Sequence, residues 1–194
     1  MSPRPVAVLL SPVLPRPGGS GRALRAWDWL RELAQAHEVH VWTPEAGEPA
    51  PGWPAHARLW PGAADLLPPA PWPRRLGWLL PGLAPRWPRV AAHWLAPADA
   101  TPGLSAMADA MGGRRVARLV VFRLYSHGVA RRLRERVPVD RAELDLDDWD
   151  SATLASVAGA LRRTGHGLDA LLARRDALQY RALELALERT VPPA

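Results

Sequence analysis

The sequence contains no cysteine and no lysine among its 194 residues. Without cysteine it has no disulfide framework and no thiolate metal site, which fits a reducing compartment. Without lysine it cannot carry the Gly-Lys-Ser/Thr signature of a phosphate-binding P-loop. It also has no run of about 18 uncharged apolar residues, so it predicts no membrane-spanning helix.

Every basic residue is arginine, and the 25 basic residues outnumber the 19 acidic ones to give a net charge of +6. Arginine titrates so high that it raises the isoelectric point to about 11.2. Such a surface favours anionic partners, namely nucleotide phosphates, anionic lipid head groups or nucleic acid. Hydrophobic residues make up 48% of the chain, which is enough for a packed core, and the length suits one domain.

The chain opens with a βαβ pattern. An apolar run over Val6–Leu10 predicts a buried strand rather than a signal peptide, because Pro12 interrupts the run. A proline-rich and glycine-rich loop follows, and then a helical pattern over Ala23–Ala36. Its predicted buried face consists of Leu24, Trp27, Leu30, Leu33 and Ala34. Alternation over Glu38–Thr43 predicts the second strand, parallel to the first.

Residues 44–104 form an irregular insert. Thirteen of the 22 prolines and six of the 10 tryptophans lie between Pro49 and Pro102. Dense proline excludes long helices, so we expect short helices over Arg74–Leu80 and Arg86–Leu95 and a short strand over Arg58–Trp60. The tryptophans either cap the sheet or form an apolar surface for a lipidic or aromatic ligand.

Strands and helices alternate again in the C-terminal half. The expected strands are Leu119–Phe122 and Ala142–Asp148, and the expected helices are Ser105–Met111, Val129–Arg136, Ala152–Arg163 and Asp169 to about Arg189. Ser151 and Asp169 are the predicted caps of the last two helices. The predicted buried stripe of the last helix consists of Leu171, Leu178, Ala182 and Leu185. This alternation predicts a Rossmann-like α/β fold, a doubly wound parallel sheet with helices on both faces.

Three strand ends hold the candidate functional residues: Pro15–Arg22, Arg123–Gly128 and Asp145–Ser151. In a parallel sheet these ends meet at one edge, where ligands bind. The glycines of the first loop either let backbone N–H groups approach a phosphate or simply form a turn. A dinucleotide fingerprint is poorly matched, because Leu24 stands where its third glycine belongs.

The acidic turn at residues 145–150 offers carboxylates at a strand end. Asp147 suits a metal, a sugar hydroxyl or a proton-accepting role, whereas Asp150 suits helix capping. A hydrolase triad of Ser126, His127 and Asp147 is disfavoured, because the serine and histidine are adjacent and no nucleophile elbow is present. The other histidines lack metal-ligand spacing, so we predict no metal site.

Four local patterns resemble the N-terminal domain of retaining glycosyltransferases of the GT-B fold. They are Val-Leu-Leu-Ser-Pro-Val-Leu-Pro-Arg-Pro-Gly-Gly-Ser-Gly-Arg near the start, His-Glu-Val-His-Val-Trp-Thr at 37–43, Val-Val-Phe-Arg-Leu-Tyr at 120–125, and Leu-Asp-Leu-Asp-Asp-Trp-Asp-Ser at 144–151 followed by Tyr-Arg-Ala-Leu-Glu at 180–184. Their order and spacing suit that domain, and together they span most of the chain outside the insert.

The resemblance implies transfer of a sugar from a nucleotide-sugar donor to a glycan, lipid or small-molecule acceptor, without a further cofactor. It implies catalytic roles for Asp147 and Arg123 and substrate contacts from Gly18, Gly19, Arg22, Tyr125 and Asp148. The family's second Rossmann-like domain, which holds the donor, is not among the 194 residues. We therefore expect a fragment, a truncated gene product or one subunit of a split enzyme, inactive alone.

Two other interpretations remain. The arginines of Arg131–Arg136 would suit a non-enzymatic module that binds nucleic acid or an anionic membrane, although nucleic acid is the less favoured partner. A small NAD-binding Rossmann protein is disfavoured by the length of the first loop. We expect a cytoplasmic protein, with contact to the inner face of the membrane as the alternative.

Overall fold

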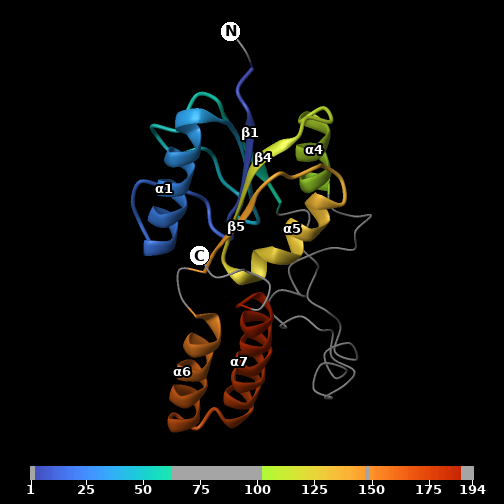
Figure 1. Cartoon of the computed structure of the whole chain (residues 1–194). Coiled ribbons are helices and arrows are strands. Elements are labelled where there is room, and N and C mark those ends of the chain that lie inside the picture. Colours follow the sequence, from blue (N-terminus) through green and yellow to red (C-terminus); the bar gives the residue numbers. More distant parts are fainter. Residues whose placement is uncertain (1–2, 63–101, 147–148, 189–194) are drawn as a thin grey trace. The chain divides into compact units, whose positions relative to one another are not determined.

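A computed structural model of the chain describes residues 3–62, 102–146 and 149–188 (Figure 1). These residues fall into two compact units. The sheet unit comprises residues 3–62 and 102–145, and the hairpin unit comprises residues 146 and 149–188. The predicted helices Arg74–Leu80 and Arg86–Leu95, and most of the predicted insert, lie outside the described residues.

The sheet unit is built on five parallel strands in the order β3-β2-β1-β4-β5. Their bounds are β1 Val6–Leu10, β2 Glu38–Thr43, β3 Ala57–Pro61, β4 Val116–Phe122 and β5 Ala142–Asp145. The short strand predicted within the insert is thus confirmed as β3, at one edge of this sheet. The predicted α/β class, a Rossmann-like parallel sheet, is confirmed.

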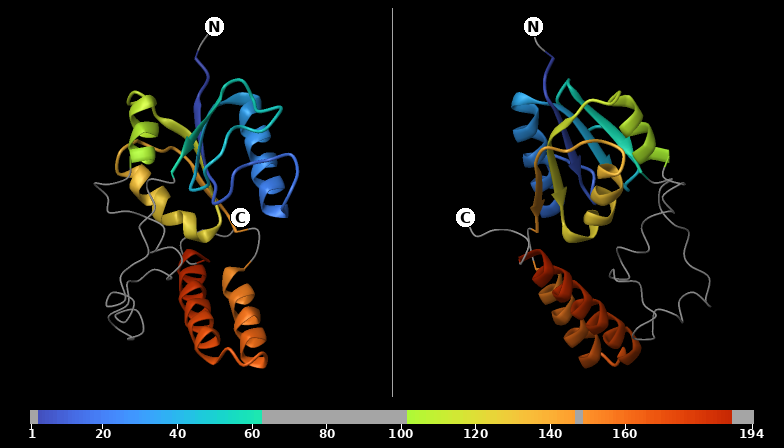
Figure 2. Two further views of the ribbon diagram at one scale, coloured as in Figure 1. Left: turned by 180° about the vertical axis from the view of Figure 1, so that it is seen from behind. Right: turned by 45° about the vertical axis from the view of Figure 1, so that its right-hand side comes forward.

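Helices cover both faces of this sheet (Figure 2). Helix α1 (Gly21–Ala36) packs on one face, against Ala7 and Leu9 of β1. Helices α4 (Pro102–Ala110) and α5 (His127–Arg134) pack on the other face, against Val6, Val8 and Leu10. All five residues of β1 are buried, which is why its sequence is a continuous apolar run rather than an alternating one.

The buried face of α1 departs from the predicted stripe at one position. Trp27, Leu30, Leu33 and Ala34 are buried as predicted, but Leu24 is 40% exposed. Ala23 and Ala26 take part in the buried face instead. The first turn therefore meets the sheet through small side chains, which allows a close approach of helix and sheet there.

The hairpin unit consists of two helices, α6 (Asp150–Arg163) and α7 (Gly167–Glu188), which pack side by side (Figure 1). The predicted caps are wrong. Trp149 occupies the N-cap position of α6, and Asp169 lies inside the first turn of α7. Glu184 of α7 accepts hydrogen bonds from the backbone N of Ser151 (3.1 Å) and its Oγ (2.5 Å), so α6 is capped by the neighbouring helix.

The predicted buried stripe of α7 is also wrong. Leu171 and Leu178 are more than 60% exposed, and Ala182 and Leu185 are exposed as well. The buried residues of α7 are Ala170, Asp176, Ala177, Tyr180 and Glu184, which lie on the opposite side of the helix. Both sides of α7 carry apolar residues, and the smaller ones pack within the unit because they allow α6 to come close.

Candidate functional site

The order of the strands defines the candidate site in the sheet unit. From β1 the chain crosses to β2 on one side, whereas β4 lies on the other side of β1. The order therefore reverses between β1 and β4. In open parallel sheets the loops that leave such a pair of strands separate, and the crevice between them is where ligands bind. Here those loops begin at Ser11 and Arg123.

The first part of the loop after β1 is held in place by polar contacts. The Oγ of Ser11 donates to the carbonyl oxygen of Val13 (2.6 Å), and the backbone N of Leu14 donates to Oε2 of Glu45 (2.7 Å). Glu45, which follows β2, thus anchors this loop through its carboxylate. Two elements that follow neighbouring strands are thus fixed to each other.

Gly18 and Gly19 lie immediately before the N-cap of α1, Ser20. Gly19 has a φ of 101°, in the region that favours glycine, and no atom lies within 4 Å of a Cβ built on Gly18 or Gly19. Ser20 caps α1 by accepting from the backbone N of Ala23 (3.2 Å). Arg22 is exposed in the first turn. Open glycines, a positive helix end and an exposed cation suit an anionic ligand.

Arg123 follows β4 directly and is only 1% exposed. Its φ of 71° is the only positive one among the described residues that are not glycine. Its backbone N donates to the carbonyl oxygen of Asp145 (2.8 Å), and its carbonyl oxygen accepts from the N of Ser126 (3.1 Å). A non-glycine residue held in this conformation costs about 1–3 kcal/mol, and such strain concentrates at functional sites. The site thus has a strained, buried, permanently charged residue beside β1.

The predicted acidic residues are only partly accounted for. Asp147 and Asp148 lie outside the described residues, and so does the side chain of Tyr125, whose backbone lies in a short 3-10 helix over Leu124–Ser126. Asp145 ends β5, and its Oδ2 accepts from Nε of Arg25 (2.9 Å) and from Nε1 of Trp29. This carboxylate therefore joins β5 to α1.

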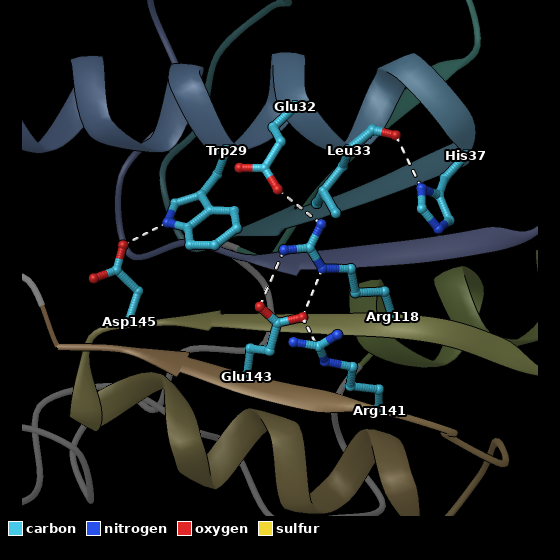
Figure 3. Close-up of polar contacts among 8 residues, drawn as sticks. All are labelled: Trp29, Glu32, Leu33, His37, Arg118, Arg141, Glu143 and Asp145. Atoms are coloured by element: carbon cyan, nitrogen blue, oxygen red, sulfur yellow. Dashed lines mark hydrogen bonds and ion pairs between the residues drawn. The ribbon is translucent and has the colours of Figure 1, made fainter. Parts of the chain in front are cut away.

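A polar clamp continues from Asp145 along the same face (Figure 3). Arg118 of β4 donates from Nε and Nη2 to the two oxygens of Glu143 (2.6 and 3.0 Å) and from Nη1 to Glu32 of α1 (2.8 Å). The Arg118 hydrogen bonds hold the pKa of Glu143 below its ordinary value, although burial acts in the opposite direction. The guanidinium groups of Arg118 and Arg25 lie over the Trp29 ring, at 5.4 and 5.7 Å from its centre.

The clamp consists of Arg25, Trp29, Glu32, Arg118, Glu143 and Asp145. It fixes α1 against β4 and β5. Among the described residues of the sheet unit, α1 is the helix that packs on this face of the sheet. The clamp thereby fixes the position of the N-terminus of α1 relative to the end of β4. Sequence reasoning missed the clamp, because its partners are separated by up to 120 positions.

Ser126 and His127, which were considered above for a hydrolase triad, have different surroundings in the structure. Ser126 is buried and bonded to Arg123 through its backbone, whereas His127 is the first residue of α5. Burial lowers the pKa of His127, and Arg131 and Arg134 lower it further. Within residues 3–62, 102–146 and 149–188, no three His, Cys, Asp or Glu side chains are grouped so that they could hold a metal ion.

A concavity with a volume of about 420 Å³ lies in the hairpin unit, between α6 and α7. It is lined by Ala155, Ala158, Gly159, Arg162, Gly167, Ala170, Leu171 and Arg174. These residues include no acid, so the groove provides cations and apolar surface but no proton acceptor.

Comparison with known proteins assigns no relative to this chain. None of the described helices is long and apolar enough to cross a membrane. No protein-family model, no curated protein and no solved structure matches the chain.

Proposed function

We propose that the chain is the acceptor-side half of a glycosyltransferase that uses a nucleotide-sugar donor. The observation that carries the proposal is the buried and strained Arg123 at the point where the strand order reverses. Strain of this kind persists only where the surrounding structure holds it. A fixed cation at this place suits a reaction in which a diphosphate departs with negative charge.

In the proposed reaction an acceptor hydroxyl attacks the anomeric carbon of the donor sugar, and the bond to the nucleotide diphosphate breaks. Gly18, Gly19 and Arg22 lie before a helix N-terminus, and this supports a role for them in contacting the donor's phosphates. Arg123 would stabilise the charge of the departing diphosphate. The donor itself would be held by a further Rossmann-like domain or subunit.

The acidic turn completes the proposed roles. Asp147 would accept a hydrogen bond from a sugar hydroxyl or take up the acceptor's proton, and Asp148 and Tyr125 would contact substrate. Asp145 is bonded to α1. We therefore assign the chemistry of this turn to Asp147 rather than to Asp145.

A titration of the chain with UDP and GDP, followed by amide chemical shifts, tests the phosphate-binding part of the proposal. We expect perturbations in residues 11–22 and 123–126 and a dissociation constant in the millimolar range, since one wall of a cleft binds weakly. Arg22→Gln should weaken binding several-fold, whereas Arg31→Gln, a matched change on the exposed side of α1, should not. Shifts that spread evenly over surface arginines, or equal effects of both variants, would contradict the proposal.

The transferase part needs a second measurement. The chain would be supplied with the polypeptide encoded next to it, in one frame or as a separate subunit, and assayed for hydrolysis or transfer of nucleotide-sugars. Under the proposal, Arg123→Gln should reduce turnover by about 100-fold, as removal of a single charge-stabilising group does. A folded complex that neither binds nor consumes UDP- or GDP-sugars would overturn it.

The alternative function, an arginine-rich binding module, draws on α5. Arg131, Arg134 and Arg136 are exposed, as a surface that binds anions requires. Glu135 lies among them, and its negative charge offsets part of theirs. The sheet unit therefore favours the glycosyltransferase proposal.

A further inference from the structure

The exposed side of α7 carries a row of leucines, the leucine ridge. Its members are Leu168 (66% exposed), Leu171 (61%), Leu178 (66%) and Leu185 (36%). Spacings of three and seven residues keep these side chains on one side of the helix, along about 25 Å. A row of large apolar side chains that are exposed along one helix is typical of a surface that binds something.

Arginines border the leucine ridge. At 100° per residue, the exposed Arg174 and Arg181 lie along one flank of the row, and the half-buried Arg175 lies on the other. Arg181 lies 5.7 Å from the ring centre of Trp149, which is itself 45% exposed. Among the described acidic side chains of α7, Asp176 and Glu184 are buried, and Glu184 pairs with Arg181 (3.8 Å). The exposed Asp169 lies on the other side of the helix from the ridge. The surface around the ridge is therefore apolar and positively charged.

This charge distribution decides between the occupants of the ridge. A second copy of the chain would form a two-fold interface in which the same arginine-bordered surface faces itself. Like charges would then meet around the leucines, which disfavours the pairing. An anionic lipid surface is complementary instead, because leucines enter the acyl boundary while arginine stems reach back to the head groups.

We propose that α7 docks the protein on an anionic membrane surface through the leucine ridge and its bordering arginines. The helix lies in the plane of the surface with its other side packed on α6. This inference does not rest on the glycosyltransferase proposal, because it uses only the hairpin unit.

The groove between α6 and α7 strengthens the inference. It is lined by Leu171 of the ridge and by the bordering Arg174, and Arg162 of α6 also lines it. Its volume of about 420 Å³ is within the range of small-ligand pockets. The groove therefore offers a head-group phosphate two cations next to the place where the leucines would enter the lipid.

Flotation of the full chain with lipid vesicles tests the proposal. Vesicles of phosphatidylcholine with 30% phosphatidylglycerol should carry the protein, and vesicles of phosphatidylcholine alone should carry at least tenfold less. Binding should weaken as the salt concentration rises, because the arginine contribution is screened. Failure of the folded wild-type chain to bind the anionic vesicles at low salt would overturn the proposal.

Variants locate the surface. Leu171→Glu with Leu178→Glu should reduce partitioning at least tenfold, and Arg174→Gln with Arg181→Gln should reduce it several-fold. Val157→Glu, which adds a negative charge at an exposed apolar position of α6, is the control beside each single leucine variant and should retain most of the binding. Circular dichroism checks that each variant keeps its helices.

Two outcomes would count against membrane docking. The first is binding that the leucine double variant leaves unchanged, because the ridge would then not be the contact. The second is a dimer in solution, seen by light scattering and dissociated by the same double variant, because a second copy would then be the occupant of the ridge.

Discussion

Acid should destabilise the sheet unit through His40. The imidazole is completely buried in β2, with its ring parallel to that of Trp60 at 5.8 Å. Nδ1 accepts from Nε1 of Trp60 (3.1 Å), and Nε2 lies 3.3 Å from Glu38. Because an indole N–H can only donate, Nδ1 carries no proton. His40 is therefore neutral in the folded protein and donates from Nε2 to Glu38.

The sign of the pH dependence follows from this state. Burial is the largest effect and lowers the pKa of His40 below its ordinary value of 6.5, while Glu38 raises it in part. In the unfolded chain His40 is protonated near pH 6.5, whereas in the folded chain it is protonated only at lower pH. The contribution of His40 is thus fully present above pH 6.5 and is lost as pH falls from there toward the folded pKa.

One proton of difference corresponds to about 1.4 kcal/mol per pH unit. His127 adds a second group of the same sign, since burial and two arginines lower its pKa. Two such groups give a limiting slope of about 2.7 kcal/mol per pH unit. Glu38 and Glu143 have pKa values below the ordinary 4.5, so their contributions are lost only at lower pH. Between pH 6.5 and 5.5 the pH dependence of the unfolding free energy therefore comes from the histidines.

Urea unfolding followed by far-UV circular dichroism, repeated from pH 8 to pH 5, measures the slope. His40→Asn should be less stable at every pH, by about 1–3 kcal/mol, because a buried hydrogen-bond partner is lost. Its slope between pH 6.5 and 5.5 should fall to about half that of the wild type. His166→Asn, at an exposed position, is the control. A His40→Asn variant with an unchanged slope would refute the assignment of a neutral His40.

Two further predictions concern helix ends. Ser20→Ala should cost about 1 kcal/mol of stability by removing the cap of α1, whereas Ser20→Asp should retain the cap. Equal midpoints of urea unfolding for the two variants would contradict this expectation. Glu184→Ala should cost the hairpin unit about 1–3 kcal/mol, because Ser151 loses the acceptor of its backbone N–H. Thermal unfolding measures this loss beside Glu135→Ala, which removes an exposed carboxylate, and equal losses in the two variants would contradict the prediction.

The sheet could be predicted from local patterns because its strands carry unambiguous ones. Val6–Leu10 is apolar throughout, and β2 follows it at the distance of one helix. Even β3 was predictable, since Arg58–Trp60 stands out from its proline-rich surroundings. In each case the local sequence and the long-range pairing require the same structure, so the prediction needed no knowledge of the partners.

Periodicity failed where both sides of a helix are apolar. In α7 the larger leucines suggested the packed face, but the helix packs through Ala170, Ala177 and Tyr180. Nothing in the local pattern distinguishes the two faces, because the choice depends on how closely α6 approaches. The cap of α6 was equally unpredictable, since the hydrogen bond from Ser151 to Glu184 spans 33 positions.

The candidate site was predictable in its location and not in its detail. The strand ends at Gly18–Arg22 and Arg123 could be assigned to one edge once a parallel sheet was expected. The positive φ of Arg123 has no local sequence signal, because the surrounding structure and not the residue type imposes it. The same applies to Asp145, which lies in an acidic run but is bonded to α1.

The central position of β1 has a consequence for synthesis of the chain. Its residues pair on one side with β2, and on the other with β4, where Leu10 is partnered by Val121. A ribosome adds about 5–20 residues per second, so the second edge of β1 waits roughly 6–20 s for its neighbour. During that interval five consecutive apolar residues present an unpaired strand edge. Newly made chains should therefore depend on chaperones that bind short apolar segments.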